Sequence, residues 1–183
     1  MPQVVKIKVQ PLTAEAFRPY GLVMEEGKQI IFPEVEEGGR PALEFQRSRG
    51  RRSGSNNTLA HFAVHFSYRQ TFIPVRGSMI LVVAPPPRNR DAQRQDYELD
   101  YEKVAAFSLS PGQAADIDMG VWHSAVVPEQ ECLWVNSTRK DAGEGVNTTR
   151  VNERGKPEWR DPRPYIEFVD IRERDDRLVE VEL

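Results

Sequence analysis

The sequence has one cysteine, three histidines and no excess of charge of either sign. Because Cys132 is the only cysteine, no disulfide can form within the chain, and the fold must rest on its apolar core. The 25 Lys and Arg residues nearly balance the 28 Asp and Glu residues, and the net charge is −3. Such a balance gives no field that would attract nucleic acid or a membrane surface. We therefore expect a small-molecule partner and neither nucleic acid nor a membrane.

Long apolar runs are also lacking. No stretch approaches the length of a membrane-spanning helix. The first ten residues, MPQVVKIKVQ, alternate as a strand does and have no apolar centre like that of a signal peptide. We therefore expect a cytoplasmic protein. The 183 residues, with 14 Pro and 12 Gly spread along them, predict a single domain over residues 1–183 that is rich in strands and turns.

What the chain does contain is a series of strand patterns after one short helix. Thr13 is placed to cap a helix in the segment TAEAFR. Residues 59–66 alternate, and residues 78–84 are continuously apolar, as in a strand buried on both faces. Residues 120–127 and 131–137 are spaced like a hairpin. Several strands at short intervals favour a sandwich or a barrel.

Two segments look peripheral to these strands. Residues 33–57 are polar and rich in Gly and Arg, which predicts a long loop with one strand around residues 42–45. Residues 138–183 form a C-terminal extension, in which YIEFVDI, residues 165–171, has a strand pattern. We expect this extension to pack on the barrel or on a partner subunit.

Two histidines lie at spacings from glycines and polar residues that are typical of a functional site. Five residues lie between Gly112 and Asp118, one between Asp118 and Gly120, and two between Gly120 and His123. Four residues lie between His65 and Gln70, and six lie between Gln70 and Gly77. These spacings resemble the two halves of the cupin pattern. The resemblance implies a mainly β fold, a cupin-type double-stranded β-helix or jelly-roll barrel, with the short helix near its N-terminus.

The cupin pattern also identifies the residues that would hold a metal. A typical cupin uses three histidines and a glutamate, and this chain has Ala63 and Gln70 at two of those positions. The ligands would then be His65, Gln70 and His123. A neutral amide brings no charge, so we expect no required cofactor and at most a weakly bound divalent metal. His61 lies about 13 Å along the strand from His65, too far to complete the set.

Three blocks of the sequence, in the same order, are similar to blocks of the ureidoglycolate lyases: residues 12–21, 65–86 and 100–123. The most specific parts are His65 with Gln70, and the run from Val121 to His123. The resemblance implies cleavage of the C–N bond of ureidoglycolate to glyoxylate and urea, a step of purine and allantoin catabolism, by a homodimer. In that family a second histidine commonly follows, where this chain has Ser124.

This reaction needs a base for the hydroxyl proton and a proton for the departing urea nitrogen. Histidine suits both tasks, because its unperturbed pKa of about 6.5 makes either protonation state accessible near neutrality. We hypothesise that His65 and His123 share these roles, without assigning base and acid. The candidates for substrate binding are Gln70 for the ureido group, Arg69 or Arg76 for the carboxylate, and Asp118 beside His123.

Two alternatives stay open at this stage. A histidine on an inward strand face is more often a hydrogen-bonded core residue than a catalyst, so the chain could be a cupin that binds a metabolite without chemistry. It could also be an enzyme for another small hydroxy or keto acid, because Asp116, Ile117 and Ser124 differ from the residues common in the family. Release of urea and glyoxylate distinguishes the lyase from both.

Overall fold

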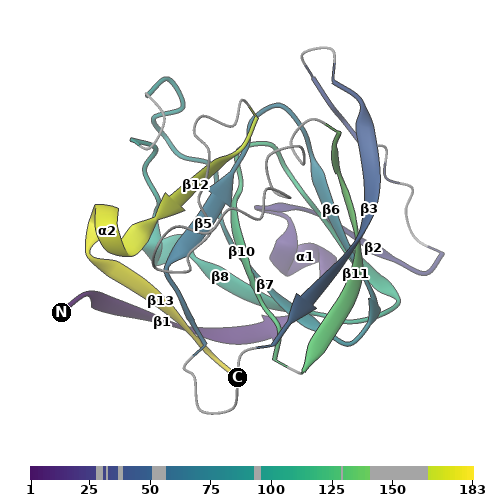
Figure 1. Cartoon of the computed structure of the whole chain (residues 1–183), viewed down its shortest axis with the longest axis horizontal. Coiled ribbons are helices and arrows are strands. Elements are labelled where there is room, and N and C mark those ends of the chain that lie inside the picture. Colours follow the sequence, from purple (N-terminus) through teal and green to yellow (C-terminus); the bar gives the residue numbers. More distant parts are fainter. Residues whose placement is uncertain are drawn as a thin grey trace, which may run out of the picture.

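The structure is a computed structural model that describes residues 1–27, 31, 33–36, 39–50, 57–92, 96–128, 130–140 and 165–183. Two curved β-sheets face each other and make up most of it (Figure 1). None of the helices among these residues is long and apolar enough to cross a membrane.

The larger sheet contains eight strands. They are β1 (Gln3–Pro11), β4 (Thr58–Leu59), β5 (His61–Val64), β7 (Met79–Ala84), β8 (Ala105–Leu109), β10 (Trp122–Val126), β12 (Glu167–Asp170) and β13 (Arg177–Glu182). The smaller sheet contains β2 (Gly21–Glu25), β3 (Pro41–Arg49), β6 (Gln70–Arg76), β9 (Gln113–Ile117) and β11 (Glu131–Arg139). The helices are α1 (Ala14–Phe17), the 3₁₀ helix η1 (Tyr101–Lys103) and α2 (Ile171–Asp175).

The strand order at the centre of both sheets is that of a jelly roll. In the smaller sheet the order is β3-β11-β6-β9, and in the larger sheet it is β5-β10-β7-β8. The chain changes sheet at most steps between these strands, and every neighbouring pair is antiparallel. Two four-stranded sheets connected in this way form the jelly roll to which cupins belong. The predicted mainly β, cupin-type fold with a short N-terminal helix is confirmed.

Local signals in the sequence account for α1 and β7. The Thr13 hydroxyl accepts a hydrogen bond from the Ala16 amide at 3.2 Å, as the predicted cap requires. All residues of β7 are buried, and its side chains alternate between two apolar clusters. Ile80 and Val82 pack in a cluster formed within the curled larger sheet, whereas Leu81 and Val83 pack with residues of the smaller sheet. The prediction of a strand covered on both faces is confirmed.

The predicted hairpin of residues 120–127 and 131–137 is wrong. β10 pairs with β5 and β7 in the larger sheet, whereas β11 pairs with β3 and β6 in the smaller one. The short connection is therefore a crossover between sheets. A connection of this length serves a hairpin or a crossover equally well, so spacing alone does not distinguish them.

The segment expected to be mostly loop contains a long strand. β3 pairs with β11 at nine positions, from Pro41 opposite Arg139 to Arg49 opposite Glu131. Its side chains alternate between exposed and half-buried along its whole length. The predicted strand around residues 42–45 is therefore only the first half of a longer one, and residues 51–56 lie outside the described residues.

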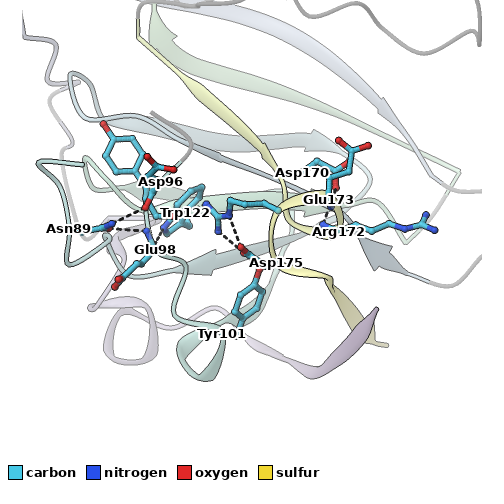
Figure 2. A network of polar contacts seen from close by, with 11 residues as sticks. Asn89, Asp96, Glu98, Tyr101, Trp122, Asp170, Arg172, Glu173 and Asp175 are labelled. Carbon is cyan, nitrogen blue, oxygen red and sulfur yellow. Dashed lines mark hydrogen bonds and ion pairs between the residues drawn. The ribbon is translucent and has the colours of Figure 1, made fainter. Parts of the chain in front are cut away.

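The C-terminal segment contributes two strands to the larger sheet of the same chain. β12 lies antiparallel beside β5, and β13 lies parallel beside β1. At α2, Asp175 accepts hydrogen bonds from the Tyr101 hydroxyl at 2.5 Å and from Arg174 Nη2 at 2.6 Å (Figure 2). Trp122 in β10 donates to the Glu98 carbonyl at 3.0 Å in the same region. The Arg174 guanidinium also lies 5.7 Å from the centroid of the Trp122 ring, which links α2 to the strand that carries His123.

Candidate active site

A cavity of about 460 Å³ lies between the two sheets. This volume is within the range of small-molecule sites. The larger sheet contributes residues of β5, β10 and β12 to its lining, and the smaller sheet contributes residues of β3, β6 and β11. The cavity is therefore walled by strands that lie on opposite sides of the barrel (Figure 1).

The structure brings His65 and His123 together. Their ring centroids are 4.9 Å apart and their planes are inclined by 65°. The loop before β10 reaches the same place, because the Gly120 amide donates to the His65 carbonyl at 2.6 Å. Gly120 has a φ of +82°, and a Cβ there would lie 3.0 Å from the Phe66 ring, so glycine suits this position on both counts. The two halves of the cupin pattern thus meet at one site.

His65 is fully buried, and both of its ring nitrogens face oxygen atoms. Nδ1 lies 2.9 Å from the Tyr68 carbonyl oxygen, and Nε2 lies 3.0 Å from Gln70 Oε1. The ring also stacks on Tyr68 with centroids 3.8 Å apart. Burial and the neighbouring His123 lower the pKa of His65 to about 3, although both hydrogen bonds act in the opposite direction. At neutral pH His65 is then neutral, with a single N–H that donates to only one of these two oxygens.

His123 faces the cavity in a different way. Its Nδ1 lies 3.1 Å from the Val121 carbonyl oxygen, which can only accept, so the hydrogen of a neutral ring sits on Nδ1. No hydrogen bond from a described residue reaches Nε2, and the residue lines the cavity. Burial lowers the pKa of His123 to about 4, despite the bond to Val121. His123 thus presents a neutral imidazole with its lone pair on Nε2.

A chain of amides connects His65 to a carboxylate across the smaller sheet. Gln70 Nε2 donates to Asn136 Oδ1 at 2.9 Å, and Asn136 Nδ2 donates to Glu44 Oε1 at 2.8 Å. Gln46 Nε2 donates to the same Glu44 oxygen. The sequence reasoning missed Glu44, Gln46 and Asn136. The alternation from residue 43 to residue 46, with the polar Glu44 and Gln46 at every second position, was the signal that could have found the first two.

The structure places the other predicted binding residues away from the cavity. Arg69 Nε donates to the buried Asp116 at 2.6 Å, and its Nη1 pairs with Asp118. Arg76 pairs with Glu131 at 2.8 Å on an exposed part of β6. Of the four predicted substrate-binding residues, only Gln70 lines the cavity. Carboxylate binding by Arg69 or Arg76 stays a prediction, and this placement does not support it.

The third histidine lies at the edge of the cavity. His61 Nε2 is 3.3 Å from Asp170 Oδ2, and 59% of its side chain is exposed. His61 lines the cavity, and it lies four residues before His65 in the chain. This is the position near the rim that the distance along the strand predicts.

The three predicted metal ligands, His65, Gln70 and His123, lie close together. His65 Nε2 lies 3.0 Å from Gln70 Oε1, and the His65 and His123 ring centroids are 4.9 Å apart. The described residues contain no group of three or more His, Cys, Asp or Glu side chains that could hold a metal. Weak metal binding by His65, Gln70 and His123 stays a prediction.

Comparisons with known proteins agree on one family. The family model for ureidoglycolate lyase matches residues 59–155. A ureidoglycolate lyase of Chelativorans sp. (strain BNC1) is 30% identical over 160 residues, which cover 78% of this chain and 88% of the relative. A ureidoglycolate lyase of Burkholderia mallei (strain NCTC 10229) is 27% identical over 137 residues, 66% of this chain and 74% of the relative. The chain belongs to the ureidoglycolate lyase family.

Likeness to solved structures is weaker. A cupin-2 domain protein from Shewanella frigidimarina is 17% identical, with a TM-score of 0.35, over 62% of this chain and 84% of that one. The fold assignment therefore rests on the strand order described above. Within this member of the ureidoglycolate lyase family, the matched range includes His65, Gln70, His123 and Asn136. The cavity walls formed by β3 and β12 lie outside it.

Proposed function

We propose that the protein is a ureidoglycolate lyase, which converts ureidoglycolate to glyoxylate and urea in purine and allantoin catabolism. Membership of the ureidoglycolate lyase family supports the reaction. The observation in the structure that carries the proposal is the neutral His123 imidazole, which lines a cavity of small-molecule size. A small carboxylate substrate is then the partner of this cavity.

The geometry supports His123 as the group that moves the proton. Its Nε2 takes the proton from the substrate hydroxyl while the oxygen forms a double bond to carbon and the C–N bond breaks. The electron pair of that bond goes to the urea nitrogen, which receives the same proton from Nε2. The reaction is then balanced without a further acid, and an imidazolium whose pKa is about 4 returns its proton readily.

His65 has a different role in this proposal. His65 does not line the cavity, and its ring packs beside His123 with its two nitrogens facing the oxygens of Tyr68 and Gln70. The two histidines therefore do not divide base and acid between them, as the sequence hypothesis had it. His123 is the catalytic residue of the proposal, and His65 is a positioning residue.

The direct test is an assay of purified protein with ureidoglycolate, in which glyoxylate and urea are measured separately. We expect the two products in equal amounts. Ligand-induced thermal stabilisation without either product would refute the lyase and favour a metabolite-binding protein. Turnover of a different hydroxy or keto acid in place of ureidoglycolate would favour the other enzymatic alternative.

We further propose a cytoplasmic homodimer. The outer face of β3 supports the dimer, because Leu43 and Phe45 are 73% and 71% exposed there. Phe45 lies opposite Val135 of β11, which in turn lies opposite Ile73 of β6, so this apolar surface continues across three strands. β3 is also the edge strand of its sheet. Exposed apolar surface beside an unpaired strand edge is typical of an interaction site.

A further inference from the structure

We infer that Glu44 recognises the ureido end of the substrate and thereby sets the direction in which ureidoglycolate lies in the cavity. This inference rests on the proposed function. Glu44 projects from β3, a strand outside the range matched by the family model. It is the only Asp or Glu among the described residues that line the cavity.

The Glu44 carboxylate is held in a fixed orientation with one oxygen available. Oε1 accepts hydrogen bonds from Asn136 Nδ2, at 2.8 Å, and from Gln46 Nε2. Among the described residues, no donor reaches Oε2. Because two amides already fix the carboxylate, little side-chain freedom is lost when a ligand donates to Oε2.

The charge of Glu44 distinguishes the two ends of ureidoglycolate. One end is a carboxylate, which a second carboxylate repels within a cavity of low polarity. The other end is a ureido group, whose N–H groups are donors and whose hydrogen bonds to an ionised acceptor are strong. The ureido end therefore lies at β3, and the carboxylate end points away from it.

This direction agrees with the position of His123. β3 and β11 belong to the smaller sheet, and β10, which carries His123, belongs to the larger one. When the ureido group of the substrate lies at Glu44, the substrate extends across the cavity and its hydroxyl-bearing carbon lies near His123. Its carboxylate then lies on the side of β5, where His61 lines the cavity.

The test measures the affinity of the two products separately. Isotope-labelled protein is titrated with urea and with glyoxylate, and binding is followed by NMR for the wild type and Glu44→Gln. We expect Glu44→Gln to weaken urea binding about 10-fold or more, since a hydrogen bond to a charged group is lost. Glyoxylate binding should stay unchanged or become tighter, because a repelling charge is removed.

The matched control is Glu180→Gln on β13. Glu180 pairs with Lys6 at 3.8 Å and does not line the cavity, so its replacement should change neither affinity. If Glu44→Gln fails to fold, Glu44→Asp keeps the charge but shortens the side chain, and urea binding should again be the affinity that falls. Urea affinity equal to that of the wild type, or equal losses for both products, would overturn the inference.

These outcomes are separable from the fate of the lyase itself. If the wild-type protein binds urea through Glu44 but releases no product from ureidoglycolate, the ureido site is supported and the proposed reaction is refuted. Normal lyase activity together with unchanged urea affinity in Glu44→Gln keeps the reaction and rejects the site.

Discussion

His65 and His123 are the same residue type in one site, and their neighbours give them different chemistry. The carbonyl of Val121 fixes the hydrogen of His123 on Nδ1 and leaves Nε2 as the acceptor. Tyr68 and Gln70 occupy both nitrogens of His65. The difference comes from backbone and amide oxygens, which a sequence comparison of the two histidines does not show.

The first prediction at the scale of single residues concerns the unequal effect of replacing these histidines. His123→Ala should lower kcat/KM by about 10²- to 10⁴-fold, the usual contribution of general acid–base catalysis. His65→Ala should lower it less, because His65 acts through its neighbours. Added imidazole should restore part of the activity of His123→Ala and none of that of His65→Ala. Near-normal turnover in both variants, with circular dichroism unchanged, would contradict the assignment.

The second residue-scale prediction concerns acid stability. The pKa values of His65 and His123 are lowered to about 3 and about 4 in the folded protein, from the ordinary histidine value of 6.5. Below pH 6.5 the unfolded chain therefore binds more protons than the folded one, so the free energy of unfolding falls as the pH falls toward 4. It should be independent of these two groups above pH 6.5. Denaturant unfolding at a series of pH values measures this slope.

The control for this prediction is the double variant His65→Asn/His123→Asn. Removal of both imidazoles should flatten the pH dependence of the unfolding free energy between pH 6.5 and 4. A slope in the double variant as steep as that of the wild type would show that the two imidazoles do not cause it. Asp175, whose pKa is lowered from 3.8 by hydrogen bonds from Arg174 and Tyr101 despite partial burial, affects the unfolding free energy mainly at still lower pH.

At the scale of elements, β7 and β3 show what a strand pattern can reveal. The apolar run of β7 and the spacing around His65 and His123 are local, and both could be predicted from the sequence. β3 was predicted only around residues 42–45, and its inward face could not be identified, because the inward positions include the polar Glu44 and Gln46 while Leu43 and Phe45 face outward. A strand that carries a site on one face and an apolar surface on the other reverses the usual pattern.

Contacts between residues that are far apart in the chain could not be predicted from the sequence either. Arg69 was a candidate for the substrate carboxylate, but it is paired with Asp116, 47 positions later, and with Asp118. Only the closing of the barrel places these groups side by side. The same holds for β10 and β11, which are consecutive strands in opposite sheets.

The element-scale prediction concerns α2 and its attachment to the cavity rim. The Asp170 carboxylate accepts from the amides of Arg172 at 2.9 Å and Glu173 at 3.2 Å (Figure 2), and it pairs with His61 at 3.3 Å. Asp170→Ala removes this cap and should lower the free energy of unfolding by about 1 kcal/mol. Thermal or denaturant unfolding measures the loss. Asp176→Asn, which removes a charge at the left-handed residue after α2, should cost less.

At the scale of the whole molecule, β3 connects the cavity with the proposed dimer surface. Its inner side chains Glu44 and Gln46 line the cavity, and its outer side chains Leu43 and Phe45 are exposed. A partner subunit that packs on the outer face would hold this edge strand, and with it the Glu44 carboxylate, in place. Assembly and substrate binding would then depend on the same strand.

The last prediction tests this link with Leu43→Glu/Phe45→Glu. Two charges in the apolar surface cost more in a buried interface than in water, so the variant should be monomeric when its mass is measured by light scattering after gel filtration. The control is Leu22→Glu on β2, the opposite edge of the same sheet, where the wild-type leucine is 43% exposed. That variant should keep the mass of the wild type.

If β3 needs its partner to hold Glu44, the monomer should show a raised KM for ureidoglycolate with a smaller change in kcat, since His123 lies on the other sheet. A wild-type protein that is itself monomeric, or a double variant that stays dimeric, would show that β3 is not the interface.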